Sequence, residues 1–127
     1  MRMRFCFTIE GRKFFARMQD TPLAGQVAAM CPFERTYTRN TGNEYYTKLP
    51  VQARQDGSEL IFKACKNQVC FFEAWNAMNI IFKDCDIAPY KIAYMGEFEE
   101  DVSQLLLNEK DTLMIQCVEP AVIHEGS

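Results

Sequence analysis

The strongest constraint on the fold is a strict alternation of apolar and polar residues in several short segments of the chain. In residues 2–10 every second side chain is large and apolar. Because successive side chains of a strand point to opposite faces, this pattern predicts a strand with one buried face. The same period returns in residues 13–18 after the tight-turn signal Gly11-Arg12, which predicts a hairpin. The predicted buried faces consist of Met3, Phe5, Phe7 and Ile9 in the first strand, and of Phe14, Ala16 and Met18 in the second.

Strand-like patterns recur along the rest of the chain. Residues 60–62 are predicted to be either a small strand or a covering segment, and residues 83–91 to be a polar loop. Two apolar segments on either side of residues 74–77 predict a second hairpin. Further strands are predicted at residues 33–38, 45–49, 69–73, 78–82, 92–95 and 112–118.

Two short segments carry helical signals instead. Asp20-Thr21-Pro22 combines a capping side chain with a proline suited to the first helical turn, and Pro32 ends the segment. Residues 99–107 have an acidic first turn followed by apolar residues at helical spacing, namely Val102, Leu105 and Leu106. Both segments are therefore predicted to be short helices.

Seven or eight short strands and two short helices, without an internal repeat or linker, fit a single domain. The length of 127 residues predicts one domain over residues 1–119 and a polar tail over residues 120–127. Many short, hairpin-linked strands close into a barrel or a sandwich, because closure removes exposed edges. The positions of the helices suit a barrel with a helix at each end. We therefore predict a mostly β fold, a closed barrel of about eight strands with two short capping helices.

Charge and hydropathy exclude several classes of partner. The chain has 14 basic and 17 acidic residues, a formal net charge of −3, and no run of Lys or Arg. Neither nucleic acid nor a membrane surface is therefore an expected partner. The first apolar stretch ends at Glu10 and Arg12, too early for a signal peptide, and no run approaches the ~20 residues of a membrane helix. A cytoplasmic location is expected.

The six cysteines are expected to be reduced in that compartment. Their spacing matches no zinc motif, and the only histidine, His124, lies in the polar tail, so no metal or other cofactor is predicted. Cys85 is the one cysteine that looks exposed. Because Asp84 and Asp86 flank it, their carboxylates are expected to raise its pKa and make it a poor nucleophile.

Several features follow one another in a fixed order along the chain. They are the opening hairpin, Asp20-Thr21-Pro22-Leu23-Ala24, Gly42-Asn43-Glu44-Tyr45-Tyr46 with Leu49-Pro50, Trp75-Asn76-Ala77-Met78-Asn79-Ile80-Ile81-Phe82-Lys83-Asp84, Met95-Gly96-Glu97-Phe98, and the helix-then-strand ending. Their order resembles the cyclophilin-like family of small, uncharacterised bacterial and archaeal proteins, over nearly all of residues 1–119. The resemblance implies a cyclophilin-type eight-stranded β-barrel with a helix at each end, and no established activity.

The resemblance also raises prolyl isomerisation as an alternative function. Cyclophilins place an arginine beside an apolar proline pocket, and Phe33-Glu34-Arg35 stands where they carry a Phe-His-Arg strand. The resemblance thus implies Arg35 as the catalytic residue of a weak peptidyl-prolyl isomerase. Gly42-Asn43-Glu44-Tyr45-Tyr46 is unlike the Gln-Gly-Gly-Asp-Phe segment that lines the cyclophilin pocket, so a paired strand arginine is the simpler interpretation of Arg35.

Aromatic residues support a different hypothesis, a non-catalytic binding module for a small molecule or peptide. Adjacent aromatics on a strand point to opposite faces, so one of Tyr45/Tyr46 and one of Phe71/Phe72 must lie outside the barrel. With Trp75 they would line a groove or form a subunit contact, which leaves a structural subunit or a homodimer as a further alternative. Glu44 and Glu73 are also considered as an acid–base pair. The candidate ligand-binding residues are Arg35, Glu44, Tyr46, Phe72, Trp75 and Asn76.

Overall fold

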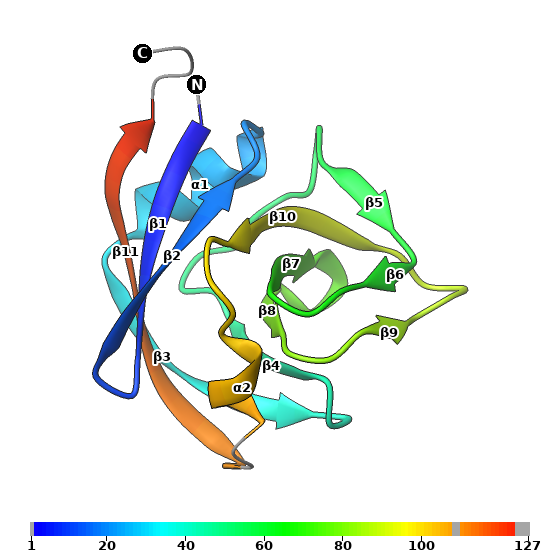
Figure 1. Ribbon diagram of the computed structural model, residues 1–127. Coiled ribbons are helices and arrows are strands. Elements are labelled where there is room, and N and C mark those ends of the chain that lie inside the picture. The colour runs from blue at the N-terminus through cyan, green and yellow to red at the C-terminus, as the bar shows by residue number, and fades with distance from the viewer. Residues whose placement is uncertain (1, 108–109, 124–127) are drawn as a thin grey trace.

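The fold is built mostly from antiparallel strands, with two short α-helices (Figure 1). The structure is a computed structural model and describes residues 2–107 and 110–123. In chain order the elements are β1 (Arg2–Ile9), β2 (Arg12–Met18), α1 (Pro22–Met30), β3 (Phe33–Asn40), β4 (Glu44–Lys48), β5 (Glu59–Ile61), β6 (Lys63–Ala64), β7 (Gln68–Phe72), the 3₁₀ turn η1 (Glu73–Trp75), β8 (Ala77–Ile81), β9 (Cys85–Asp86), β10 (Ile92–Phe98), α2 (Ser103–Leu106) and β11 (Thr112–Ile123).

Eight of these strands form a closed barrel. The wall runs in the order β2-β1-β11-β3-β4-β8-β7-β10, and β10 pairs with β2 to close it. The closure needs a glycine: Gly96 pairs with Met18, and a Cβ at this position would lie 2.2 Å from the carbonyl oxygen of Arg17. The predicted mostly β barrel of about eight strands with two helices is confirmed.

The alternation seen in the first hairpin defines the inner face of the barrel. Phe5, Phe7 and Ile9 are completely buried, and Met3 is partly buried against the same core. On β2 the predicted residues Phe14, Ala16 and Met18 are buried as well. On the outer face of β1, Arg4 forms two hydrogen bonds of 2.7 Å to Glu99. The predicted inward faces of this hairpin are therefore confirmed. The turn lies one residue earlier than predicted, at Glu10-Gly11, because Ile9 pairs with Arg12.

The two helices differ in how well the sequence predicted them. Helix α1 begins where expected, because Thr21 caps it by accepting a hydrogen bond from the Ala24 amide, and Pro22 occupies its first turn. Helix α2 is much shorter than the predicted 99–107, and the acidic residues precede it. Asp101 instead forms a turn before the helix, because its carboxylate accepts hydrogen bonds from the amide and hydroxyl of Ser103, and Val102 is the N-cap residue. Val102 and Leu106 are buried as predicted.

Three short strands form a layer outside the barrel. β5 pairs with β10, whereas β6 and β9 pair only with each other. We call β5, β6, β9 and the loop after β9 the covering layer; it lies to the right of the barrel in Figure 1. A second small apolar cluster joins this layer to the wall, and its members are Ala64, Cys70, Ile81 and Ile92, with Ile61, Phe72, Cys85 and Ile87 packed against them.

Two boundaries differ from the sequence prediction. Residues 83–91 are not entirely loop, because Ala64 and Lys63 pair with Cys85 and Asp86. Strand β11 continues beyond residue 119 to Ile123 and pairs with β1 over this extension, since Ala121 lies opposite Arg4. Residues 124–127 lie outside the described part of the chain. Periodicity alone missed both extensions, because a two-residue strand is too short to show a period and Pro120 is unusual inside a strand.

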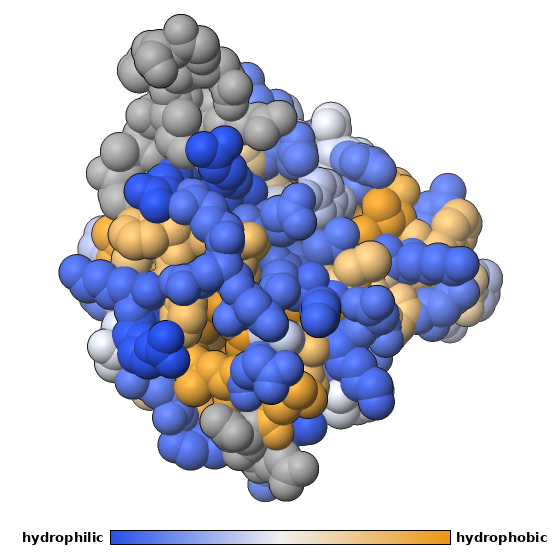
Figure 2. Space-filling view, in the orientation of Figure 1, coloured by the Kyte–Doolittle hydropathy of each residue, from blue (hydrophilic) through white to orange (hydrophobic). Residues whose placement is uncertain are grey.

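The surface seen in Figure 2 is mostly hydrophilic, with hydrophobic side chains gathered over α2 and β5. Exposed large hydrophobic residues near these elements include Leu107 and Leu60. Within the described residues, no helix has both the length and the apolar character needed to cross a membrane.

Candidate functional site

The strands β4, β7 and β8 place alternate residues in two different environments. On β4, Tyr45 is 1% exposed inside the barrel, whereas Tyr46 is half-buried on the opposite face. On β7, Phe71 is completely buried and Phe72 is half-buried. The expectation that each adjacent pair is divided between the two faces is confirmed. The outer members lie beside the covering layer.

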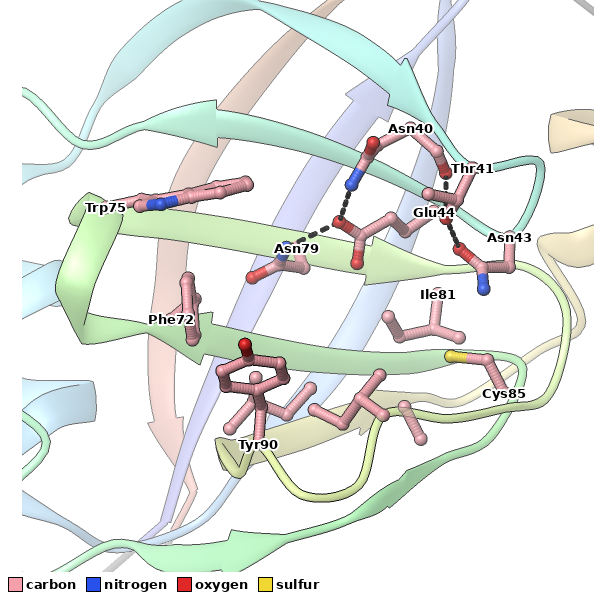
Figure 3. A pocket seen from close by; sticks show the side chains of 13 residues that line it. Asn40, Thr41, Asn43, Glu44, Phe72, Trp75, Asn79, Ile81, Cys85 and Tyr90 are labelled. Carbon is pink, nitrogen blue, oxygen red and sulfur yellow. Dashed lines mark hydrogen bonds between the residues drawn. The ribbon is translucent and has the colours of Figure 1, made fainter.

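A groove of about 510 Å³ lies between the outer face of these strands and the covering layer (Figure 3). This volume is within the range of roughly 300–1,000 Å³ that is typical of small-molecule sites. Trp75 stands at one end of the groove, and the turn containing Thr41 and Asn43 stands at the other. The residues that line it are Asn40, Thr41, Asn43, Glu44, Ala64, Phe72, Trp75, Asn79, Ile81, Cys85, Ile87, Tyr90 and Ile92.

The polar part of the groove is centred on Glu44, at the start of β4. Asn40 and Asn79 each donate a side-chain N–H to Glu44 Oε1, at 3.1 Å. The pairing of β4 with β3 and β8 brings the three residues together, because Asn40 lies opposite Glu44, and Glu44 lies opposite Ile81, two residues along β8 from Asn79. No hydrogen bond from the described residues reaches the second carboxylate oxygen, Oε2. The carboxylate is thus fixed through one oxygen and available through the other.

Asn79 is the most unusual residue of the site. Its side chain is only 4% exposed, and its carbonyl oxygen Oδ1 accepts no hydrogen bond from the described residues. A buried amide oxygen without a partner is destabilising by about 1–3 kcal/mol. In Figure 3 this oxygen points toward the end of the groove occupied by Trp75 and Phe72. A ligand that donates a hydrogen bond there would satisfy it.

Aromatic rings form the wall at this end. Phe72 and Trp75 meet edge to face, with ring centroids 5.2 Å apart and an interplanar angle of 84°. Tyr46 supports Trp75 from outside the groove lining, at a centroid distance of 6.1 Å. Tyr90 from the covering layer completes the wall and is 68% exposed. Edge-to-face pairs are favourable geometries, so the Phe72–Trp75 pair holds the indole in a defined orientation.

The covering layer supplies the opposite side of the groove. The β6–β9 pair brings Ala64 and Cys85 next to each other, and both line the groove. The loop after β9 is held by Asp86, whose carboxylate accepts a hydrogen bond of 3.0 Å from the Ala88 amide. Ile87 and Tyr90 of this loop line the groove.

The thiols are arranged differently from the sequence prediction. The exposed cysteine is Cys65, whereas Cys85 is half-buried, so the expectation that Cys85 alone looks exposed is wrong. Cys85 packs against the small apolar cluster between the barrel wall and the covering layer. The periodicity of the sequence did not predict this packing. The pKa of Cys85 is raised, as predicted, but burial is the first cause, followed by Glu44, with Asp84 a smaller contribution.

The structure brings together three of the sequence-derived candidates, Glu44, Phe72 and Trp75, and places Tyr46 directly behind Trp75. Asn76 is outside the lining. Its left-handed backbone ends η1, and its side chain accepts from the Ala53 amide at 2.9 Å and donates to the Val51 carbonyl at 3.1 Å. Asn76 thus fastens the loop after β4.

Two further candidates also lie elsewhere. Arg35 is exposed near the middle of β3, opposite Ile115 of β11, and is not among the residues of the groove. Glu73 accepts a hydrogen bond from the Gln55 amide at 2.9 Å and lies 3.7 Å from Arg54, whereas Glu44 binds Asn40 and Asn79. The two carboxylates are therefore engaged with different partners.

Sequence reasoning missed Asn79, Asn40 and Tyr90. Asn79 carried a usable signal, because it is the only polar residue in the apolar segment 77–82. Tyr90 carried none, since its segment resembled an ordinary polar loop. Among the described residues, no group of three or more His, Cys, Asp or Glu side chains is placed to hold a metal ion; His124 lies outside them.

A closed eight-stranded antiparallel barrel with two short helices is consistent with a cyclophilin-like fold. The model of the Cyclophilin-like family matches residues 7–116, so the chain belongs to this family. Among solved structures, the chain is similar to that of the hypothetical protein AF2241 from Archaeoglobus fulgidus. The TM-score is 0.72 with 16% sequence identity, and the match covers 93% of this chain and 95% of the other. That likeness is one of fold. No curated protein matches the chain in sequence.

Proposed function

We propose that this protein is a non-catalytic binding module that holds a small molecule in the groove outside the barrel. The observation that carries the proposal is the buried Asn79 oxygen, which has no hydrogen-bond partner among the described residues and points into the groove. Buried polar groups are almost always hydrogen-bonded, so an unpartnered one that lines a groove suggests that the partner is a ligand. The aromatic wall and the volume of the groove add to this argument.

The lining favours binding over catalysis. Its titratable side chains are Glu44, Cys85 and Tyr90. Burial raises the pKa of the Cys85 thiol, which leaves little thiolate for nucleophilic attack at neutral pH. Two of the three groove asparagines, Asn40 and Asn79, donate to the same Glu44 oxygen, and such contacts orient a carboxylate for recognition.

The alternative function, weak prolyl isomerisation, receives less support. That reaction needs a cation at the prolyl nitrogen to stabilise the transition state electrostatically. The groove lining contains no cationic side chain, and Arg35 lies outside it. We expect negligible acceleration of prolyl isomerisation in a standard peptide assay, and Arg35→Ala is expected to leave that result unchanged.

The proposal is tested with a set of small molecules that includes positive, neutral and negative compounds. Backbone amide chemical shifts are recorded during titration, and the shifts of bound compounds are expected to cluster at residues of the groove such as Ile81 and Cys85. Trp75→Ala is expected to weaken binding, whereas Phe62→Ala is the matched control, because Phe62 is an exposed aromatic outside the lining. Shifts that cluster elsewhere, a set without any binder, or concentration-dependent self-association through the Trp75 surface would contradict the proposal.

A further inference from the structure

The groove carries a single charge. Of the 13 side chains that line it, only Glu44 is ionic, and none is Lys, Arg or His. The field of this carboxylate reaches its neighbours, because it contributes to raising the pKa of the thiols of Cys70 and Cys85. An anionic ligand would meet this negative charge without a compensating cation, whereas a cationic ligand would neutralise it.

Two hydrogen-bond acceptors at the same place lack donors. They are Oε2 of Glu44 and Oδ1 of Asn79, and the 3.1 Å hydrogen bond between the two side chains makes them neighbours. One N–H of each of the Asn40 and Asn79 amides is directed to Glu44 Oε1. These two acceptors favour a ligand that donates at least two hydrogen bonds.

Aromatic faces lie beside these acceptors. Figure 3 shows Trp75, Phe72 and Tyr90 around the end of the groove toward which the Asn79 oxygen points. A cation near such rings is attracted by their negative faces, with tryptophan the strongest partner. The rings also offer an apolar surface to the uncharged part of a ligand.

We infer that the groove binds a protonated primary amine attached to an aromatic or other apolar group, as a free small molecule. The ammonium group donates to Glu44 and Asn79, and the apolar group lies against Phe72, Trp75 and Tyr90. This inference rests on the proposed function, since it names the ligand class of the same groove. A free amine fits better than a lysine of a protein, because Trp75 and the Thr41–Asn43 turn bound the groove at both ends.

The first experiment compares four probes of similar shape on the unaltered protein: 2-phenylethylamine, its trimethylammonium analogue, 2-phenylethanol and 3-phenylpropanoate. Trp75 is the only tryptophan of the chain, so its fluorescence reports occupancy of the groove directly. The primary amine is expected to bind about 10-fold or more tightly than the alcohol, because its hydrogen bonds are charge-assisted. The trimethylammonium compound is expected to bind more weakly than the amine, because it has no N–H to donate, and the propanoate is expected to bind least.

The second experiment removes the charge but keeps the shape. Glu44→Gln is expected to lower the affinity for 2-phenylethylamine by about 10-fold or more, while changing that for 2-phenylethanol by less than about 2-fold. Glu34→Gln is the matched control, because it makes the same change of net charge at an exposed position of β3 outside the lining; it is expected to have no effect. Thermal unfolding of both variants verifies that they fold. If Glu44→Gln does not fold, the comparison of the four probes decides alone.

The outcomes distinguish failure of the ammonium inference from failure of the proposed binding function. Tighter binding of the alcohol or the propanoate in the groove would overturn the ammonium inference and leave the proposed binding function standing. Equal loss of amine and alcohol affinity in Glu44→Gln would also overturn it. Tighter binding of a lysine-containing peptide than of 2-phenylethylamine would identify a protein ligand instead of a free amine. If none of the four probes binds, the ammonium inference is overturned. If no compound in the set of positive, neutral and negative small molecules binds in the groove either, the proposed function is overturned.

Discussion

The inner and outer faces of β4, β7 and β8 have opposite chemistry, although the same three strands supply both. The inner face is sealed and almost entirely apolar, so its residues serve packing. The outer face carries a carboxylate, a buried amide and aromatic edges next to an open volume, so its residues are available to a ligand. Neighbouring residues are divided in this way at Tyr45 and Tyr46, Phe71 and Phe72, and Met78 and Asn79.

The comparison shows how one alternating pattern produces both a core and a site. A strand in a barrel wall cannot bury one residue without turning the next outward. Where nothing covers the outer face, polar residues such as Arg4 occupy it. Where the covering layer lies over it, the outward residues become half-buried, as Phe72 is, or completely buried, as Cys70 is, and a groove forms between two packed surfaces.

The largest expected difference between the faces is in stability. Phe71→Ala removes a completely buried ring and is expected to lower the free energy of unfolding by about 3–5 kcal/mol. Phe72→Ala removes the half-buried neighbour and its edge-to-face contact with Trp75, and is expected to cost only about 1–2 kcal/mol. Urea unfolding followed by circular dichroism measures both values. Equal losses at the two positions would mean that the covering layer packs as tightly as the core.

A second test concerns the thiols, which report how well each surface is covered. Cys65 is exposed and is expected to react first with a thiol reagent, whereas Cys85 is half-buried with a raised pKa and is expected to react later. Cys70, which faces outward beneath the covering layer, is completely buried, and burial raises its pKa strongly. It is expected to react only when the covering layer opens or the protein unfolds.

Mass spectrometry of the modified native protein measures this order. Cys65→Ser is the control and is expected to abolish the fast phase. Rapid labelling of Cys70 in the native protein would show that the covering layer is open, and the groove would then lack its second wall.

The sequence predicted the inner face far better than the groove. A period of two places Phe5, Phe7 and Ile9 on one side of a strand, and burial of that side then determines the register. The same period shows that Tyr45 and Tyr46 are divided, but not which of them is outside, because both are aromatic. The groove also depends on segments without periodicity. Cys85, Ile87 and Tyr90 come from a segment that resembles a polar loop, and tertiary packing alone gives it a position.

Capping and turn contacts explain the remaining differences between the sequence predictions and the structure. In the sequence, Asn76 is a candidate ligand contact because it follows Trp75. In the structure its side chain forms hydrogen bonds with the backbone of Val51 and Ala53 instead. In the sequence, Asp101 resembles part of a helical first turn. In the structure its carboxylate binds the Ser103 amide, and the helix begins only at Ser103. Such short-range competition between side chain and backbone is not visible in hydropathy.

The smallest expected effect concerns two of the buried polar atoms that lack a hydrogen-bond partner among the described residues, one on each face of the barrel wall. The Tyr37 hydroxyl is completely buried in the barrel and accepts or donates no hydrogen bond among the described residues. Burial, together with the thiols of Cys117 and Cys31, raises its pKa well above the ordinary value. Because the interior of the barrel is closed, no ligand can form a hydrogen bond with this hydroxyl. Its burial therefore only destabilises the folded state, through the lost hydration of the hydroxyl. The Asn79 oxygen has the same deficit, but its residue lines the groove.

Tyr37→Phe is therefore expected to leave the free energy of unfolding unchanged or to raise it by up to about 1 kcal/mol, because it removes an unsatisfied buried group and keeps the ring. The same variant is expected to bind 2-phenylethylamine as the unaltered protein does. Asn79→Leu, of similar volume, is expected to weaken that binding by about 10-fold. Urea unfolding and Trp75 fluorescence titration measure the two quantities on both variants. A loss of more than about 1 kcal/mol in Tyr37→Phe would reveal a partner for the hydroxyl. Unchanged amine binding in Asn79→Leu would mean that the groove does not use its unpartnered oxygen, and the distinction between the two faces would then be one of packing alone.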